Sequence, residues 1–283
     1  MVPISDADIA GKIRRATFQG ASMEEMRPLY IERNAFELAL DAPVYRIIEL
    51  QYFLEDWSKK RLTYSKIDKI IWKDSSENLL LFQKFKDEIT DGQFPLFNEI
   101  VSRFYGSCWS ATAFDTTSDN WAIFSRNNPA VRVQSTPRKL LDTTMSKKNK
   151  FYMLQHFIGK MRYAADVDIK EYFSDPNWEK YLDSNGQGIA TSFLLLSENL
   201  SHENEVRLIY DHLGEWSNDN VWVTADRCFA KVPFNWPAVI DDLVVGPLVS
   251  DGEKIMICKE LKEFGINCTV SSSSTRTNIG YPV

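Results

Sequence analysis

One segment constrains the fold of this chain more than any other, because its hydrophobic pattern is that of a β-strand with two unlike faces. Within residues 201–210, apolar and charged positions alternate: Val206, Leu208 and Tyr210 against Glu203, Glu205 and Arg207. In a strand, such alternation puts the two sets on opposite faces. An antiparallel strand with one face on the core and one half solvated is the usual setting for this pattern. The segment therefore predicts antiparallel pairing and two carboxylates side by side on one face.

The rest of the chain mixes short β-rich segments with helical ones in no regular βαβ order. Residues 44–48, 104–110, 130–133, 221–223, 228–232 and 243–245 have strand composition. Helical spacing recurs before Pro43, where Ser22 and Glu25 form a capping box, and again over 253–264. We predict an α+β fold with a mixed, mainly antiparallel sheet and surrounding helices. Residues 1–42 should form a helical extension packed on a single α+β domain of residues 43–283.

Charge and hydropathy limit the classes of partner. Lys and Arg number 33 and Asp and Glu 39, and the resulting net charge of −6 argues against a broad surface for duplex nucleic acid. The net charge does not exclude a local basic groove. The chain has no apolar run near the roughly 20 residues of a membrane span and no signal-like start, so we expect a cytoplasmic protein without membrane contact. Its four cysteines lie far apart, which predicts buried thiols rather than a metal cluster or disulfides.

Glu203 and Glu205 are the first candidates for catalysis. One carboxylate could stabilise a cationic centre or take a proton while its neighbour shifts its pKa. The alternative is a solvated strand face on which Arg207 pairs with one of them for a fraction of a kcal/mol, about what exposed pairs contribute.

Several further residues are candidates for ligand binding. Tyr45 and Arg46, at the end of an apolar segment, are both candidates for binding a cofactor. The Arg46 guanidinium could bind a phosphate or carboxylate through two hydrogen bonds, or Arg46 could be an ordinary rim arginine. The hydroxyls of Ser110 and Thr112 could bridge a ribose or a catalytic carboxylate, or only cap a strand end. Trp109 and Trp121 could stack on a ligand or belong to the core.

Metal and nucleophile signatures are weak. The three histidines, at 156, 202 and 212, have no ligand spacing, and His202-Glu203 lacks the second histidine of a zinc protease motif. We therefore predict no metal site.

Taken together, several motifs resemble a widespread, largely uncharacterised family of bacterial domains. They are Tyr45-Arg46-Ile47, Trp72-Lys73-Asp74, Glu77-Asn78, Cys108-Trp109-Ser110, Ser118-x-x-Trp121, Glu203-x-Glu205-Val206-Arg207 and Val245-Gly246-Pro247. The resemblance spans about residues 43–270. The sequence departs from the family pattern at Ser75-Ser76, where the family usually has proline and an aromatic residue.

The order of Arg46, Ser110-x-Thr112 and Glu203-x-Glu205 is also similar to that of the arginine-serine-glutamate ADP-ribosyltransferases. This second resemblance implies that Arg46 anchors NAD, that Ser110 and Thr112 brace the site, that Glu205 holds the nicotinamide-side ribose, and that Glu203 activates the acceptor. It implies a toxin or anti-phage effector that modifies a macromolecule or hydrolyses NAD. The sequence leaves open a protein partner or inhibitor and does not identify the acceptor. Two alternatives stay open: a non-enzymatic binding module built on Arg46 and Trp109, and a metal-dependent nuclease using both glutamates.

Overall fold

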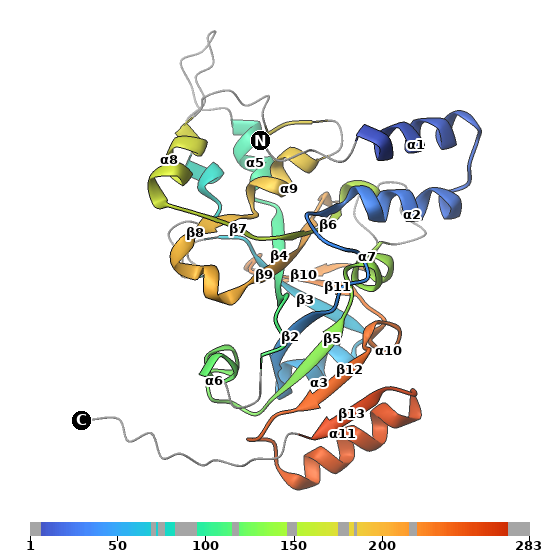
Figure 1. Ribbon diagram of the computed structural model, residues 1–283, viewed down its shortest axis with the longest axis vertical. Helices are drawn as coiled ribbons and strands as arrows, with labels where there is room; N and C mark the ends of the chain where they lie inside the picture. The colour runs from blue at the N-terminus through green and yellow to red at the C-terminus, as the bar shows by residue number, and fades with distance from the viewer. Residues whose placement is uncertain are drawn as a thin grey trace.

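The computed structural model describes residues 7–68, 72, 77–82, 95–114, 119–145, 152–174, 181–183, 186–214 and 220–270. Within them a large sheet runs through the centre of the molecule, with helices on both sides (Figure 1). Its main path is β1 (Ala35–Phe36), β6 (His156–Lys160), β9 (Glu205–Asp211), β4 (Phe104–Ser110), β2 (Val44–Glu49), β5 (Ala130–Ser135), β12 (Asp242–Val245) and β13 (Asn267–Val270). Ser75 and Ser76, where the sequence departs from the family pattern, lie outside the described residues.

The sheet branches at β4. One edge of β4 pairs with β9 along its whole length, from Phe104↔Asp211 to Ser110↔Glu205. The other edge is shared: β2 pairs with it only at Ser110, while β3 (Arg61–Lys66) pairs with it at Gly106 and Tyr105. From β3 the branch continues through β11 (Phe229–Pro233) to β10 (Trp222–Val223).

Antiparallel pairing dominates, as the sequence predicts. Of the pairs in this sheet only β1 with β6 and β12 with β13 are parallel. A separate parallel pair joins β7 (Arg162–Ala164) to β8 (Leu195–Ser197). The prediction of an α+β fold with a mixed, mainly antiparallel sheet is confirmed.

Each face of the sheet has its own apolar core. On one face, Val206, Leu208 and Tyr210 pack with side chains from α3 (Leu50–Ser58), α7 (Pro137–Thr144), α10 (Trp236–Val239) and α11 (Asp251–Glu263). On the other, Ile209 packs with side chains from η1 (Leu79–Phe82), α5 (Pro95–Val101), α8 (Asp166–Ser174) and α9 (Gln187–Ser192). Strand β9 is therefore buried on both faces at every residue.

This burial corrects the prediction of a half-solvated strand. The strand also begins later than the sequence pattern suggests, because residues 198–203 form the 3-10 helix η4 (Glu198–Glu203) and Asn204 follows in the left-handed region with φ of 45°. Asparagine tolerates that conformation better than most residues. Glu203 consequently lies on the turn that leads into the strand, and only Glu205 and Arg207 share a strand face.

The N-terminal residues are helical, as predicted, and form α1 (Ala7–Phe18) and α2 (Met23–Arg33). The capping box is present: Ser22 accepts from the Glu25 amide, and the Glu25 side chain accepts from the Ser22 amide. The two helices lie side by side at one end of the molecule (Figure 1). No helix among the described residues is both long and apolar enough to span a bilayer.

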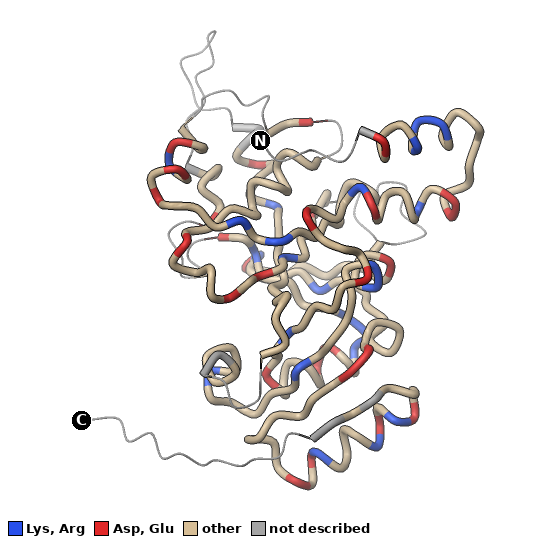
Figure 2. Tube along the Cα trace, in the orientation of Figure 1, with Lys and Arg blue, Asp and Glu red and all other residues tan. Residues whose placement is uncertain are grey.

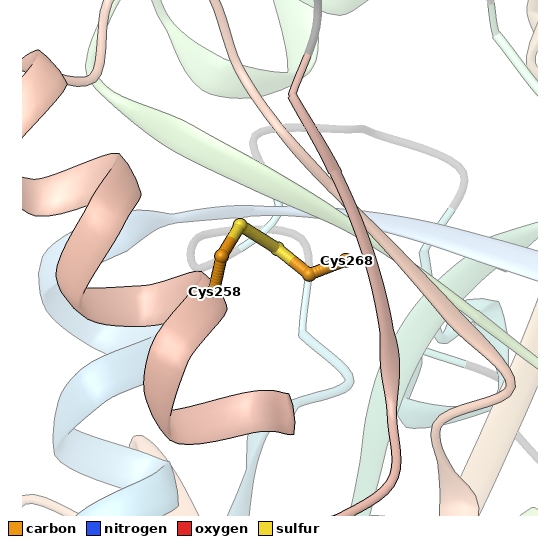
Figure 3. Close-up of a disulfide and its surroundings, with 2 residues drawn as sticks. All are labelled: Cys258 and Cys268. Atoms are coloured by element: carbon orange, nitrogen blue, oxygen red, sulfur yellow. A yellow bond between two sulfur atoms is a disulfide. The ribbon is translucent and has the colours of Figure 1, made fainter. Parts of the chain in front are cut away.

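The prediction of buried thiols and no disulfide is wrong: two cysteines are joined in a disulfide, and the other two are half-buried. Cys258 on α11 and Cys268 on β13 form a disulfide, with a Cα–Cα distance of 5.4 Å (Figure 3). Helix α11 packs directly on β13, which brings together residues ten positions apart that form no recognisable spacing motif. Cys108 and Cys228 are not disulfide-bonded.

Reduction of this disulfide should destabilise the region of α11 and β13. The bond closes a loop of ten residues, and loops of that length are associated with about 2–3 kcal/mol of stabilisation. Urea unfolding with and without dithiothreitol measures the loss, and the Cys258→Ser/Cys268→Ser double variant serves as the control that dithiothreitol should not affect. Equal stability of the oxidised and reduced chains would contradict this expectation.

The fold should lose stability at acidic pH because of His156 on β6. Its imidazole is buried against the Tyr210 ring, 5.0 Å between centroids. Burial, with a smaller contribution from the positive charge of Arg27, lowers the pKa of His156 to about 3. The unfolded chain takes up a proton below its ordinary value of 6.5 and the folded chain does not, so stability falls as the pH drops below that value.

His156 by itself should contribute a loss of roughly 2 kcal/mol between pH 7 and pH 5. Asp211 acts in the opposite direction over this range, because burial raises its pKa to about 6, so the effect of His156 is measured as a difference between two proteins. The variant His156→Phe keeps an aromatic ring beside Tyr210 but has no group to protonate, so its unfolding free energy should fall by less over this range. Urea titrations of both proteins at the two pH values test this. An identical pH dependence for the two proteins would show that His156 is not responsible.

Candidate active site

The side chain at the centre of the site is Arg207, whose five N–H donors are all used. Its Nε donates to Glu205 Oε1 at 2.9 Å and its Nη2 to Glu205 Oε2 at 3.2 Å. Both terminal nitrogens donate to the Glu77 carboxylate at 2.9 Å, and Nη1 also donates to the Phe193 carbonyl at 2.8 Å. Arg207 thus holds Glu205 and Glu77 in fixed orientations at the floor of the site.

Electrostatics and packing both fix this guanidinium. Burial by itself would lower the pKa of Arg207, but the Glu205 and Glu77 carboxylates outweigh it and raise the pKa well above its ordinary value. The Trp72 ring lies over the guanidinium, 4.4 Å from Cζ to the ring centroid. Glycine at position 106 makes room for this ring, because a Cβ there would meet the indole at 3.0 Å. One permanent positive charge is therefore shared between two buried carboxylates, which leaves a net negative charge.

A cleft of about 640 Å³ opens above this group. Glu77 and Glu205 line it, as do Glu203 and Asp166, while Lys170 of α8 is its basic lining residue. The remaining lining residues are Trp72, which precedes η1, and residues of β4, β8, η1, η4 and α8: Leu79, Cys108, Ile169, Leu196, Ser197, Asn199 and Leu200. Its volume falls in the range of small-molecule sites, about 300–1,000 Å³. The cleft is acidic at its floor.

A second, smaller cleft of about 50 Å³ adjoins the first, and the two share Cys108, Glu203 and Glu205. Its other lining residues are Tyr45, Arg46, Ile47, Trp109, Ser110, Phe114 and Phe124. The three residues that the sequence predicts should converge, Arg46, Ser110 and Glu205, therefore border one cleft.

Ser110 and Thr112 hold the turn that carries Glu203. Ser110 Oγ donates to the Glu203 carbonyl at 3.0 Å and accepts from the Thr112 amide at 3.0 Å. The Asn204 side-chain amide donates to Thr112 Oγ1 at 2.8 Å. These contacts join the end of β4 to the start of β9 and place Glu203 at the junction of the two clefts.

Arg46 borders the small cleft but points its guanidinium elsewhere. Its Nη1 donates to Ser107 Oγ at 2.8 Å, and Arg46 pairs with Val133, whose side chain belongs to the core on the face away from Glu205. Burial lowers the pKa of Arg46, although Cys108 and Asp56 act in the opposite direction.

The other predicted binding residues differ in position. Tyr45 lines the small cleft, with the Arg132 guanidinium 5.6 Å from its ring centroid. Trp109 is 2% exposed and belongs to the core on the opposite face, and Trp121, 5% exposed, lies against Gly246 and lines neither cleft. Both tryptophans are buried, as the core interpretation describes, and Trp109 also borders the small cleft.

Sequence reasoning missed four residues of the site. Glu77 and Trp72 come from segments whose local pattern says nothing of β9, and Lys170 occupies a charged position of an ordinary helix. Tyr163 on β7 accepts a hydrogen bond from the Glu205 amide at 2.9 Å, and burial raises its pKa to about 12. Glu77 was inside a family motif, which is the one signal that could have identified it.

The thiol of Cys108 is not an activated nucleophile. Burial and the negative charge of Glu205 raise the pKa of Cys108 well above its ordinary value, so the thiol is protonated at neutral pH. No group of three or more His, Cys, Asp or Glu residues in the described part of the chain is arranged to hold a metal ion.

Comparison with known proteins gives a distant likeness only. No protein-family model and no curated protein matches the chain, so its resemblance to the bacterial domain family stays a prediction. Among solved structures, DarT from Thermus sp. 2.9 in complex with ADP-ribosylated ssDNA is 12% identical, with a TM-score of 0.35 over 82% of this chain and 94% of that one. The DarT complex with NAD⁺ is 11% identical, with a TM-score of 0.31 over 82% and 96%. Likeness at this level carries no argument about function, which must come from the residues above.

Proposed function

We propose that the chain is an enzyme of the ADP-ribosyltransferase type, which cleaves NAD between nicotinamide and ribose and passes ADP-ribose to a macromolecule or to water. The single observation that carries the proposal is the Glu205 carboxylate, 4% exposed, fixed by two bonds from Arg207 and lining both adjoining clefts. A fixed anionic group at the floor of a cleft is suited to a reaction in which positive charge develops.

The large cleft fits NAD by size and charge. Its volume of about 640 Å³ suits a ligand of that class. The acidic floor at Glu205 and Glu77 favours the cationic nicotinamide ring and the adjoining ribose. Lys170 would take a phosphate near the rim, and Arg46 borders the adjoining small cleft.

Two carboxylates then divide the chemistry. The bond from ribose C1′ to the nicotinamide nitrogen breaks, and its electron pair leaves with neutral nicotinamide. Glu205 stabilises the positive charge that develops at the ribose. An acceptor oxygen or nitrogen, or water, forms the new bond to C1′ and gives its proton to Glu203, which the Ser110 contact holds at the junction of the clefts.

The test is to incubate the purified full chain with NAD, with and without cell extract as a source of acceptor, and to follow nicotinamide release. The expected result is release by the wild type and loss of release in Glu205→Gln. Binding of NAD without release in any condition would favour the alternative of a non-enzymatic binding module. Nucleic-acid cleavage that requires magnesium and Glu205, with NAD untouched, would favour the nuclease.

A further inference from the structure

The sheet face that carries Glu205 continues away from the clefts onto the branch. Gly106 lies two residues from Cys108 and therefore on the same face of β4. Ser65 is opposite Gly106, and Phe229 is opposite Ser65. Residues directly opposite in a sheet share a face. The same rule extends this face to Lys231 on β11 and to its partner Trp222 on β10.

This surface, which we call the Trp222 face, consists of Arg61, Thr63, Ser65, Trp222, Phe229 and Lys231. Trp222 is 54% exposed and Phe229 38% exposed, unusual values for large aromatic side chains in strands. The Trp222 ring is held in place by two cations, Lys231 Nζ at 5.3 Å and Arg61 Cζ at 5.9 Å from its centroid. Both cations come from strands of the sheet, and the exposure of the ring leaves area for a second planar group.

The charge around this face differs in sign from that of the whole chain. Residues 55–68 and 222–231 hold six basic side chains (Lys59, Lys60, Arg61, Lys66, Arg227, Lys231) and four acidic ones (Glu55, Asp56, Asp68, Asp226), a net charge of +2 in a chain of −6. Of the basic residues, Arg61 and Lys231 belong to the Trp222 face itself, and Glu55 contacts both, Lys231 at 2.9 Å and Arg61 at 3.9 Å. Acidic and basic positions are otherwise interspersed along the chain (Figure 2).

From this combination we infer that the Trp222 face binds a single-stranded nucleic acid. Exposed aromatic rings that stack on bases, with cations that contact the phosphates, are the two parts such a platform needs. Trp222 and Phe229 are diagonal neighbours on adjacent strands, roughly 7–8 Å apart as is usual for such positions, so each can take its own base.

The clefts and the Trp222 face lie on the same side of the sheet. Branch strands β3, β11 and β10 lie one, two and three strand spacings from β4, within roughly 15 Å, and β9 with Glu205 is on the other side of β4. The Trp72 ring covers Gly106 between them, so a nucleic acid bound to the Trp222 face would have to pass around this ring to reach Glu203 and Glu205. A role of the bound nucleic acid as acceptor rests on the proposed function, whereas binding itself does not.

The experiment measures binding by fluorescence anisotropy, with the full chain, no NAD, and a labelled single-stranded oligonucleotide of about 20 nucleotides at about 50 mM salt. Trp222→Ala should weaken binding about 5- to 100-fold, the effect of losing one stacked base. Tyr52→Ala is the matched control, because Tyr52 on α3 is 53% exposed but lies outside the Trp222 face, and it should bind as the wild type does.

Three results would overturn the inference: no binding by the wild type, equal binding by Trp222→Ala, or equally tight binding of the matching duplex or of an acidic peptide. The two proposals fail separately. If oligonucleotide binding depends on Trp222 but NAD is not consumed, the proposed enzyme activity is wrong and the binding role of the Trp222 face is supported. NAD consumption that depends on Glu205 without oligonucleotide binding would do the reverse.

Discussion

Replacing Glu205 with glutamine is expected to lower the rate of nicotinamide release by about 100- to 1,000-fold, as loss of one preorganised electrostatic contact does elsewhere. Glutamine has the same shape and keeps one oxygen for Arg207, but it removes the negative charge that faces both clefts. The effect should fall on kcat more than on KM, because the charge matters most where positive charge develops. Initial rates at several NAD concentrations separate the two constants.

Asp211→Asn provides the matched control for this variant. Asp211 lies on the same strand, is 4% exposed, and is likewise paired with an arginine, Arg103, at 2.5 Å. It lines neither cleft. Its amide variant should release nicotinamide at nearly the wild-type rate. If both variants lose activity equally, the loss in Glu205→Gln reflects damage to the strand and Glu205 has no special chemical role.

The strand at residues 205–211 shows how much structure the local sequence pattern can predict. Alternation of apolar and charged residues predicted an antiparallel strand and identified Val206, Leu208 and Tyr210 as core, which the structure confirms. The same pattern predicted a solvated opposite face, because an alternating sequence carries no sign of what packs there. The side chains that cover this face come from α8, α9 and η1, which lie outside the strand segment.

The contacts that form the site likewise join residues that are far apart in the sequence. Glu77 is 130 positions from Arg207, and Ser110 is 93 positions from the Glu203 carbonyl that it holds. The first contact depends on how the segment before η1 packs on the sheet, and the second on the register of β4 with β9. A single sequence reveals neither. Arg46, Ser110 and Glu205, which the order of the motifs groups together, do border one cleft. That order could not tell that the Arg46 guanidinium turns to Ser107 on the other side of the sheet, since that depends on where β2 leaves β4.

Arg207 should be the most sensitive position for stability. Replacing it with methionine, which is similar in length and apolar, leaves Glu205 and Glu77 buried without a counter-charge, at 4% and 2% exposure. Breaking a buried ion pair from one side typically costs about 3–5 kcal/mol. Urea unfolding at pH 7 should show a loss of this size. Arg103→Met, which removes a 34% exposed partner of Asp211, should cost less.

A triple variant tests whether charge is the cause. Arg207→Met combined with Glu205→Gln and Glu77→Gln has no buried charge left in this group, so it should regain part of the stability that Arg207→Met loses. Acidification gives an independent check with a defined sign: neutralising the two carboxylates removes the penalty, so Arg207→Met should approach the wild type as the pH falls. If the gap between them is constant with pH, and the triple variant is no more stable than the single one, the role of Arg207 is in packing against Trp72. In that case Glu205 would owe its fixed position to the strand alone, and the ion pair would be dispensable to the site.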